Sequence, residues 1–267
     1  MRMITKTLLV MASAAAFSSS PVMAQDAGSD KSWSQADQYY DPAEMDQARK
    51  DTQAAMGGQT TYFLMADRLE TQMAHGNEVL LWDGQGWISG DVDKFWFKTE
   101  GEYAFAEDKF EEAEFQGLWS HAIGPYYDVQ AGVRYDARPD DLVHAVIGVQ
   151  GLAPQWFEID AAAFLSDDGD LTARVEAEND LLLTQRLILQ LRVEVGFSAQ
   201  DIPEREIGAG VTSLEAGLRL RYEIKREFAP YIGVEWQKKF SETADRARAS
   251  GGDPDRAVFV AGLRLWY

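Results

Sequence analysis

The chain has 267 residues, 46% of them hydrophobic, and a formal net charge of −19 at pH 7. This hydrophobic content is ordinary for a folded protein and the length allows one large domain or two small ones, so a folded chain is expected. The negative charge argues against a nucleic-acid partner, whose phosphates would be repelled, and the absence of cysteine excludes disulfides, a thiolate nucleophile and Cys-ligated zinc.

Residues 1–24 predict a secretory signal peptide. Arg2 and Lys6 precede an apolar stretch, and small residues including Val22 and Ala24 form the pattern of a cleavage site. The apolar run is too short for a membrane anchor, since a spanning helix needs ~18 or more apolar residues, and no later stretch is long enough either. We therefore expect cleavage after Ala24, which removes two basic residues and takes the formal charge from −19 to −21. If the exported chain spans a membrane, it must do so with strands.

Residues 25–58 predict a flexible polar segment. They are rich in Asp, Gln, Ala and Gly and show no alternation of apolar and polar side chains. Asp41 and Pro42 are typical of a helix start, so a short helix over residues 42–56 is predicted, and its thin apolar face should make it marginally stable.

Residues 59–267 show a different pattern, with alternating segments of about 10 to 14 residues separated by turn residues. In the clearest segment, Leu218 and Leu220 fall on one face and Arg219 and Arg221 on the other. This pattern predicts an all-β domain. The twelve predicted strands cover residues 61–73, 78–89, 92–106, 109–122, 126–138, 142–153, 156–166, 171–182, 186–199, 211–224, 228–241 and 256–267.

Two architectures fit this alternation. In a soluble sandwich or lipocalin-like barrel the apolar row faces inward, whereas in an outer-membrane barrel it faces lipid and the charges line the lumen. Long connections near the C-terminus alternate with short ones, as extracellular loops alternate with periplasmic turns. The last strand ends on the aromatic Tyr267 and would lose its free edge by pairing with the first.

A third feature also favours an antiparallel up-and-down transmembrane β-barrel of about 12 strands. Aromatic residues gather near the strand ends, as two interfacial girdles require. These residues are Trp82, Trp87, Trp119, Tyr126, Tyr127, Trp156, Tyr231, Trp236 and Tyr267.

The facing assignment predicts a lumen with about fifteen acidic and eight basic side chains. Most should pair across the lumen, because unpaired charges in a narrow interior are costly, and the acidic surplus would concentrate cations. The alternative is that the ion pairs only hold the shape of the barrel. The predicted acidic lining is Glu70, Glu100, Glu102, Glu112, Glu114, Asp128, Asp136, Glu158, Asp160, Glu176, Glu178, Glu194, Glu215, Glu223 and Glu235, with the bases Arg68, Lys98, Arg134, Arg174, Arg192, Arg219, Arg221 and Arg264.

Several long blocks stand out in the barrel region, among them "LLWDGQGWISGDVDKFWFKTEGE", "GVQGLAPQWFEIDAAAFLSDDGD", "LEAGLRLRYEIKREFAPYIGVEW" and "VAGLRLWY". These blocks resemble the copper-resistance protein B family of Gram-negative outer membranes, and the resemblance covers most of residues 61–267. It implies an outer-membrane β-barrel that binds copper, as Cu+ or Cu2+, and takes part in copper homeostasis and resistance.

One feature departs from that family, whose members often carry an N-terminal segment dense in Met and His. Residues 25–58 hold only Met45 and Met56 and no His. Because thioether and imidazole groups are the ligands that suit copper, we expect copper chemistry to rest more on the barrel.

Five barrel residues are candidate copper ligands. Met73 and His75 lie at the first outward loop, where continued alternation would put both side chains on one face. Met65 belongs to the same row and is expected to face lipid or to pack. His144 falls on the lumen row near the outer end of its strand, and His121 lies near an inner turn. A lone His is more often a hydrogen-bonded structural residue than a ligand.

Two other functions stay open. A lipid hydrolase would need a Ser and a His aligned on the lipid-facing wall, and neither such a pair nor a G-x-S-x-G elbow is evident, so no enzyme is expected. A porin-like channel for small cations or solutes is the stronger rival, although twelve strands with a charge-packed lumen leave less open area than the ~16 strands of a porin. The expected partners are outer-membrane lipid and copper ions, with a periplasmic copper protein as a further candidate, and the barrel is expected to be a monomer.

Overall fold

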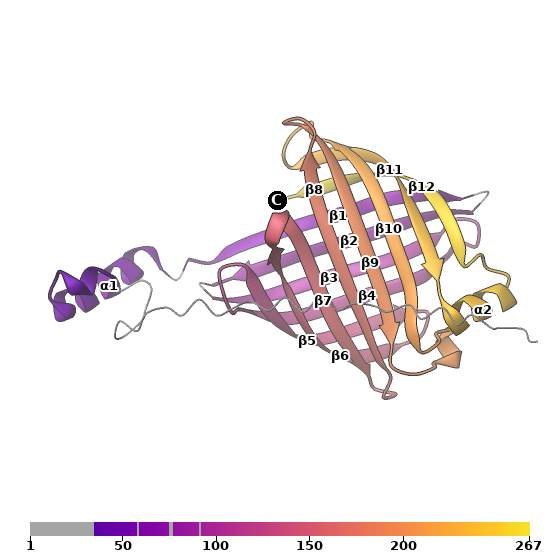
Figure 1. The fold of residues 1–267 in the computed structure, drawn as a ribbon, viewed down its shortest axis with the longest axis horizontal. Coiled ribbons are helices and arrows are strands. Elements are labelled where there is room, and N and C mark those ends of the chain that lie inside the picture. Colours follow the sequence, from indigo (N-terminus) through magenta and orange to yellow (C-terminus); the bar gives the residue numbers. More distant parts are fainter. Residues whose placement is uncertain (1–34, 58, 75–76, 91) are drawn as a thin grey trace, which may run out of the picture. The chain divides into compact units, whose positions relative to one another are not determined.

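The structure, a computed structural model, describes residues 35–57, 59–74, 77–90 and 92–267. Its strands form a closed antiparallel barrel in which each strand pairs with its neighbours in sequence and β12 pairs with β1 (Figure 1). This confirms the predicted all-β up-and-down fold. The strands are β1 (Thr61–Ala74), β2 (Asn77–Ser89), β3 (Asp93–Ala104), β4 (Lys109–Ala122), β5 (Tyr127–Arg138), β6 (Leu142–Ala153), β7 (Phe157–Ser166), β8 (Leu171–Leu182), β9 (Leu187–Ser198), β10 (Gly210–Tyr222), β11 (Phe228–Lys239) and β12 (Asp255–Trp266).

The C-terminal strand closes the barrel against β1. The amide of Tyr267 donates to the carbonyl of Leu64 at 2.8 Å, and the amide of Leu64 donates to the carbonyl of Tyr267 at 3.0 Å. Because β12 also pairs with β11, neither terminal strand leaves a free edge in the membrane, where an unpaired backbone group would find no water.

Apolar side chains cover the outside of the barrel, and charged side chains fill its inside. On β10, Leu218 and Leu220 are 43% and 37% exposed, whereas Arg219 and Arg221 are 1% and 4% exposed. A soluble β protein would bury the apolar row instead. The arrangement is therefore that of a barrel solvated by lipid.

Two aromatic residues predicted to lie in the interfacial girdles face the lumen instead. Tyr231 is 5% exposed, and its hydroxyl donates to Glu70 Oε2 at 3.0 Å. Trp87 packs against a buried cluster formed by Trp96, Leu118, Val146 and Phe164. The position of a residue near a strand end does not determine whether its side chain faces lipid or the lumen, so the girdle pattern alone could not place these two residues.

A bulge in β1 reverses the alternation within that strand. Ala66 and Arg68 pair with Gly84 and Asp83, which are adjacent on β2, so Asp67 is the extra residue. Both Asp67 and Arg68 are buried, at 8% and 2% exposure. Residues that precede the bulge therefore face the lumen at odd positions and residues that follow it at even positions.

The barrel has two unlike ends. We call the end at which β1 begins and β12 ends the terminal end, and the opposite end the loop end. Two long connections meet at the loop end: residues 199–209 with the 3-10 helix η3 (Pro203–Arg205), and residues 240–254 with α2 (Ser241–Ala249). The amide of Gly208 donates to Thr243 Oγ1 at 2.8 Å, which ties the first connection to the second. A further 3-10 helix, η2 (Pro154–Trp156), forms a turn at the terminal end.

The described residues up to Ala55 belong to a separate unit, which holds a short 3-10 helix, η1 (Gln35–Gln38), and all but the last residue of the helix α1 (Pro42–Met56). Asp41 Oδ1 accepts the amides of Ala43 and Glu44 at 2.9 and 3.3 Å, so Asp41 and Pro42 start the helix as predicted. α1 buries no side chain. The predicted signal peptide lies outside the described residues. Among the described residues, no helix is both long and apolar enough to cross a membrane.

Candidate functional site

Three of the most deeply buried charges of the lumen form a triad between β1, β10 and β11. The guanidinium of Arg219 donates to both oxygens of Glu70, at 2.8 and 2.9 Å, and to Glu235 Oε2 at 2.6 Å. All three residues are 1% exposed. Two carboxylates that share one bidentate guanidinium carry one excess negative charge, and Tyr231 donates a further hydrogen bond to Glu70.

Two glycines make room for this triad. A Cβ atom at Gly217 would lie 2.4 Å from Arg219 Nη1, and a Cβ atom at Gly262 would lie 2.7 Å from the Cβ of Glu70. Side chains at these lumen-facing positions would push the ion pairs apart.

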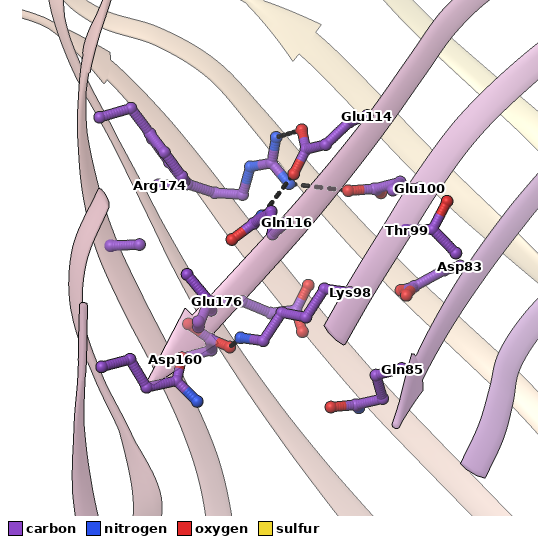
Figure 2. A pocket seen from close by; sticks show the side chains of 14 residues that line it. Asp83, Gln85, Lys98, Thr99, Glu100, Glu114, Gln116, Asp160, Arg174 and Glu176 are labelled. Carbon is purple, nitrogen blue, oxygen red and sulfur yellow. Dashed lines mark hydrogen bonds and ion pairs between the residues drawn. The ribbon is translucent and has the colours of Figure 1, made fainter. Parts of the chain in front are cut away.

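A second group of charges spans the lumen between opposite walls. Arg174 on β8 donates to Glu100 on β3 at 2.7 Å and to Glu114 on β4 at 3.0 Å, and Figure 2 shows its guanidinium lying between the two carboxylates. Glu100 also accepts a bond from Arg68 at 2.6 Å, and Glu114 pairs with Arg134 at 2.9 Å. Each of these carboxylates is therefore held by two guanidinium groups.

Arg192 holds a third group on β8, β9 and β10. Its Nε donates to Glu176 at 2.8 Å, its Nη1 donates to Glu215 at 3.2 Å and its Nη2 pairs with Glu194. Arg192 is 2% exposed. Nearer the terminal end, Arg264 pairs with Asp67 at 2.8 Å and with Asp180 at 3.7 Å.

One lysine crosses the lumen with a single partner. Lys98 on β3 pairs with Asp160 on β7, and the two side chains are 18% and 29% exposed. Figure 2 shows Lys98 reaching toward Asp160 on the opposite wall. Among the described residues, neither takes part in another ion pair.

Four cavities follow one another along the lumen. A mouth cavity of about 330 Å³ lies at the loop end and a terminal cavity of about 380 Å³ at the terminal end. Between them lie a central cavity of about 80 Å³ and an acidic cavity of about 50 Å³. Adjacent cavities share lining residues. These are Glu114, Phe164 and Arg174 for the mouth and central cavities, Asp83, Gln85, Asp160 and Glu176 for the central and acidic cavities, and Glu158, Glu178 and Arg264 for the acidic and terminal cavities.

The charge of the lining becomes more negative toward the middle of the lumen. The mouth cavity is lined by six carboxylates and five basic groups. The central cavity is lined by five carboxylates and two basic groups. The acidic cavity is lined by six carboxylates and one basic group; the carboxylates are those of Asp67, Asp83, Glu158, Asp160, Glu176 and Glu178. A narrow lining of one predominant sign attracts cations and repels anions.

Met65 lines the acidic cavity, so the expectation that it shares the face of Met73 is wrong. The bulge at Asp67 puts the two on opposite faces of β1, and the Sδ of Met65 lies 3.5 Å from Arg264 Nη2. Met73 is 42% exposed on the lipid-facing side, beside Leu218 and Ile232. His75, predicted to share a metal with Met73, lies outside the described residues. Among the described residues that line the four cavities, Met65 alone carries sulfur.

The two described histidines lie in different surroundings. His144 is 1% exposed inside the barrel, its Nε2 lies 3.1 Å from Asp136 Oδ2, and its Nδ1 has no hydrogen-bond partner among the described residues. The same Asp136 oxygen accepts a bond from Arg205 of the loop end at 3.1 Å. His121 is half-buried near the terminal end, with its Nδ1 2.8 Å from Asp93 Oδ1. Within the described part of the chain, no three His, Asp or Glu side chains are placed to hold a metal ion together.

The remaining predicted acidic residues take the following places. Asp128 pairs with Lys94, and Glu102 and Glu112 lie opposite each other on β3 and β4 toward the loop end. Glu158 lines the acidic and terminal cavities, and Glu223 pairs with Arg226 at 2.6 Å in the turn between β10 and β11.

Sequence reasoning missed several lumen charges, namely Asp67, Asp83, Lys94, Asp180 and Arg205. Asp180 continues the row of Glu176 and Glu178, so alternation could have found it. Alternation did not reveal Asp83, because glycines occupy part of the lipid-facing row of β2. It did not reveal Asp67 because that residue forms a bulge, nor Arg205 because that residue lies in a loop without periodicity.

Comparisons with known proteins show which family this chain is similar to. Residues 60–267 match the family model "Copper resistance protein B precursor (CopB)". The chain is 46% identical over 207 residues to copper resistance protein B of Escherichia coli, and the match covers 77% of this chain and 69% of the relative. It is 45% identical over 206 residues to a copper resistance protein B homolog of Pseudomonas syringae pv. tomato, with the same coverage of both chains.

A solved structure supports the fold alone. The NanC porin matches with a TM-score of 0.51 and 8% identity, over 77% of this chain and 99% of that chain. Together with the lipid-facing apolar surface, these findings identify an outer-membrane β-barrel. The chain belongs to the copper resistance protein B family.

Proposed function

We propose that the barrel binds copper ions in its acidic lumen and passes or holds them at the outer membrane, and that it thereby contributes to copper resistance and homeostasis. The observation that carries this proposal is the acidic cavity, which combines six carboxylates with the thioether of Met65. Carboxylates supply negative charge with little selectivity, whereas a thioether prefers Cu+ to the hard cations. The family supports copper as the ion, because its name and those of both relatives refer to copper resistance.

The size of the cavities favours ions over larger solutes. The central and acidic cavities measure about 80 and 50 Å³, which is room for a few water molecules, since one water needs about 10–15 Å³. A sugar could pass only if the cross-lumen ion pairs separated. We therefore rank the porin-like alternative for small solutes below copper binding, and we infer a binding or transport role rather than catalysis.

The two methionines of β1 provide a matched pair of variants. Met65→Leu removes sulfur from the lumen, and Met73→Leu removes it from the lipid-facing side of the same strand. Affinity for Cu+ would be measured on the refolded barrel by competition with a coloured chelator. Met65→Leu should weaken Cu+ binding by at least about tenfold, since even the outer partners of a metal ligand are worth that much, and Met73→Leu should leave it unchanged.

Three results would separate the alternatives. Equal affinity of the wild type and Met65→Leu would remove the lumen sulfur from the proposal. A loss confined to Met73→Leu would favour the loop site that Met73 was predicted to form with His75. Rapid swelling of liposomes in sugar solutions would favour the porin-like channel over a copper-binding lumen.

A further inference from the structure

We infer that Lys98 is a displaceable gate: its ammonium group occupies a cation position beside Asp160, and a cation that moves along the lumen takes that position over. This inference rests on the proposed function, in which small cations enter the lumen. Beyond that function, the inference assigns to Lys98 the control of cation movement between the central and acidic cavities.

Asp160 lies where the central and acidic cavities meet. Asp160 lines both the central and the acidic cavity, and Lys98 lines the central cavity and reaches Asp160 from the opposite wall (Figure 2). An ion that moves between these two cavities must therefore pass the carboxylate that Lys98 now neutralises. Two further carboxylates, Asp83 and Glu176, line both cavities, so the local surplus of negative charge favours any cation that replaces the ammonium.

The chemistry of lysine makes this ion pair easier to open than its neighbours. Arg174 and Arg192 each bond several carboxylates through a planar fork. Lys98 has one ion-pair partner among the described residues, and its cross-strand neighbours Gln85 and Gln116 are uncharged. The lysine ammonium is a flexible, strongly hydrated point charge with one ion-pair partner. Breaking its contact therefore costs less free energy than displacing a guanidinium that bridges two or more carboxylates.

The same strand offers a matched control. Lys94 also pairs with a single carboxylate, that of Asp128, and it lies against the rings of Trp87 and Trp96. Neither Lys94 nor Asp128 lines any of the four cavities described above. Removing the charge of Lys94 therefore changes the lumen charge by the same amount as removing that of Lys98, without opening the path.

The experiment is single-channel recording of the full-length barrel in planar bilayers with KCl, which uses K+ as the probe and no copper. Lys98→Met should raise K+ conductance about tenfold and should keep the preference for K+ over Cl−. A tenfold rise is the low end of the increase in local ion concentration that a focused field of one sign produces. Lys94→Met should conduct like the wild type. Equal conductance of Lys98→Met and the wild type, or an equal rise in Lys94→Met, would overturn the inference.

A second variant protects the test against misfolding of Lys98→Met. Lys98→Arg keeps the charge and can bond Asp160 with two N–H groups, so its conductance should fall below that of the wild type, and a rise would contradict the gate. The outcome is separable from that of the copper titration. If the barrel binds no copper but Lys98→Met conducts more K+, the copper proposal fails and the gate stands. If copper binds and Lys98→Met conducts like the wild type, the gate alone fails.

Discussion

Met65 and Met73 occupy positions of the same parity on β1, yet Met65 faces the lumen and Met73 faces lipid. The cause is Asp67, the extra residue of a bulge between them. Because the bulge absorbs one residue, positions of equal parity before and after it lie on opposite faces of the barrel wall. Of the two methionines, Met65 is therefore the one that could meet an ion in the lumen.

Deletion of Asp67 is expected to leave the barrel folded. Ala66 and Arg68 already pair with two adjacent residues of β2, so the deletion removes the bulge without changing which way Met65 points. Deletion of Leu69 is the control, because closing the bulge would then put Arg68 in the lipid-facing place of Leu69, and a charged side chain there costs up to about 2–4 kcal/mol. Circular dichroism after refolding into liposomes would show the difference. Equal folding of both variants would contradict this account of the bulge.

Arg219→Met should destabilise the barrel by about 3–5 kcal/mol, because it leaves the buried carboxylates of Glu70 and Glu235 without their shared cation. Urea unfolding in liposomes would measure the loss. Adding Glu70→Gln and Glu235→Gln to this variant should restore part of the stability, since the unpaired charges are then gone. Arg248→Met, which removes an exposed pair with Asp245, should change stability by less than about 1 kcal/mol.

Ile232→Arg tests which side of the wall meets lipid. Ile232 is 65% exposed near the middle of β11, so an arginine there should cost about 2–4 kcal/mol at the bilayer midplane. Ile232→Leu should fold like the wild type. A soluble, monodisperse Ile232→Arg variant that is as stable as the wild type without detergent would show that this surface faces water.

Arg205→Ala should loosen the connection between β9 and β10. Arg205 bonds Asp136 inside the barrel at 3.1 Å, and Asp136 keeps Arg134 and His144 when Arg205 is removed. The barrel should therefore stay folded while proteolysis of residues 199–209 rises about tenfold, as expected from the loss of a charge-assisted hydrogen bond worth about 1.5–3 kcal/mol. Arg248→Ala, also at the loop end, should be cleaved at the wild-type rate. Unchanged cleavage of Arg205→Ala would show that this contact does not hold the loop.

Alternation in the sequence was sufficient to predict the class of fold and most of the lumen. Each strand places successive side chains on opposite faces, so rows such as Leu218 and Leu220 against Arg219 and Arg221 can be read without a structure. Alternation alone does not say whether the apolar row faces a core or lipid. The terminal Tyr267 and the connection lengths favoured lipid, and the closed barrel with exposed leucines confirmed it.

The tertiary structure decided what alternation cannot represent. A bulge at Asp67 put Met65 and Met73 on opposite faces of β1, a loop brought Arg205 to Asp136, and barrel closure set Asp160 opposite Lys98. Each of these results depends on register or on contacts between distant strands, whereas periodicity reports only the neighbours along one strand. The rows of charge are thus a property of the local chain, and the partners across the lumen are a property of the closed barrel.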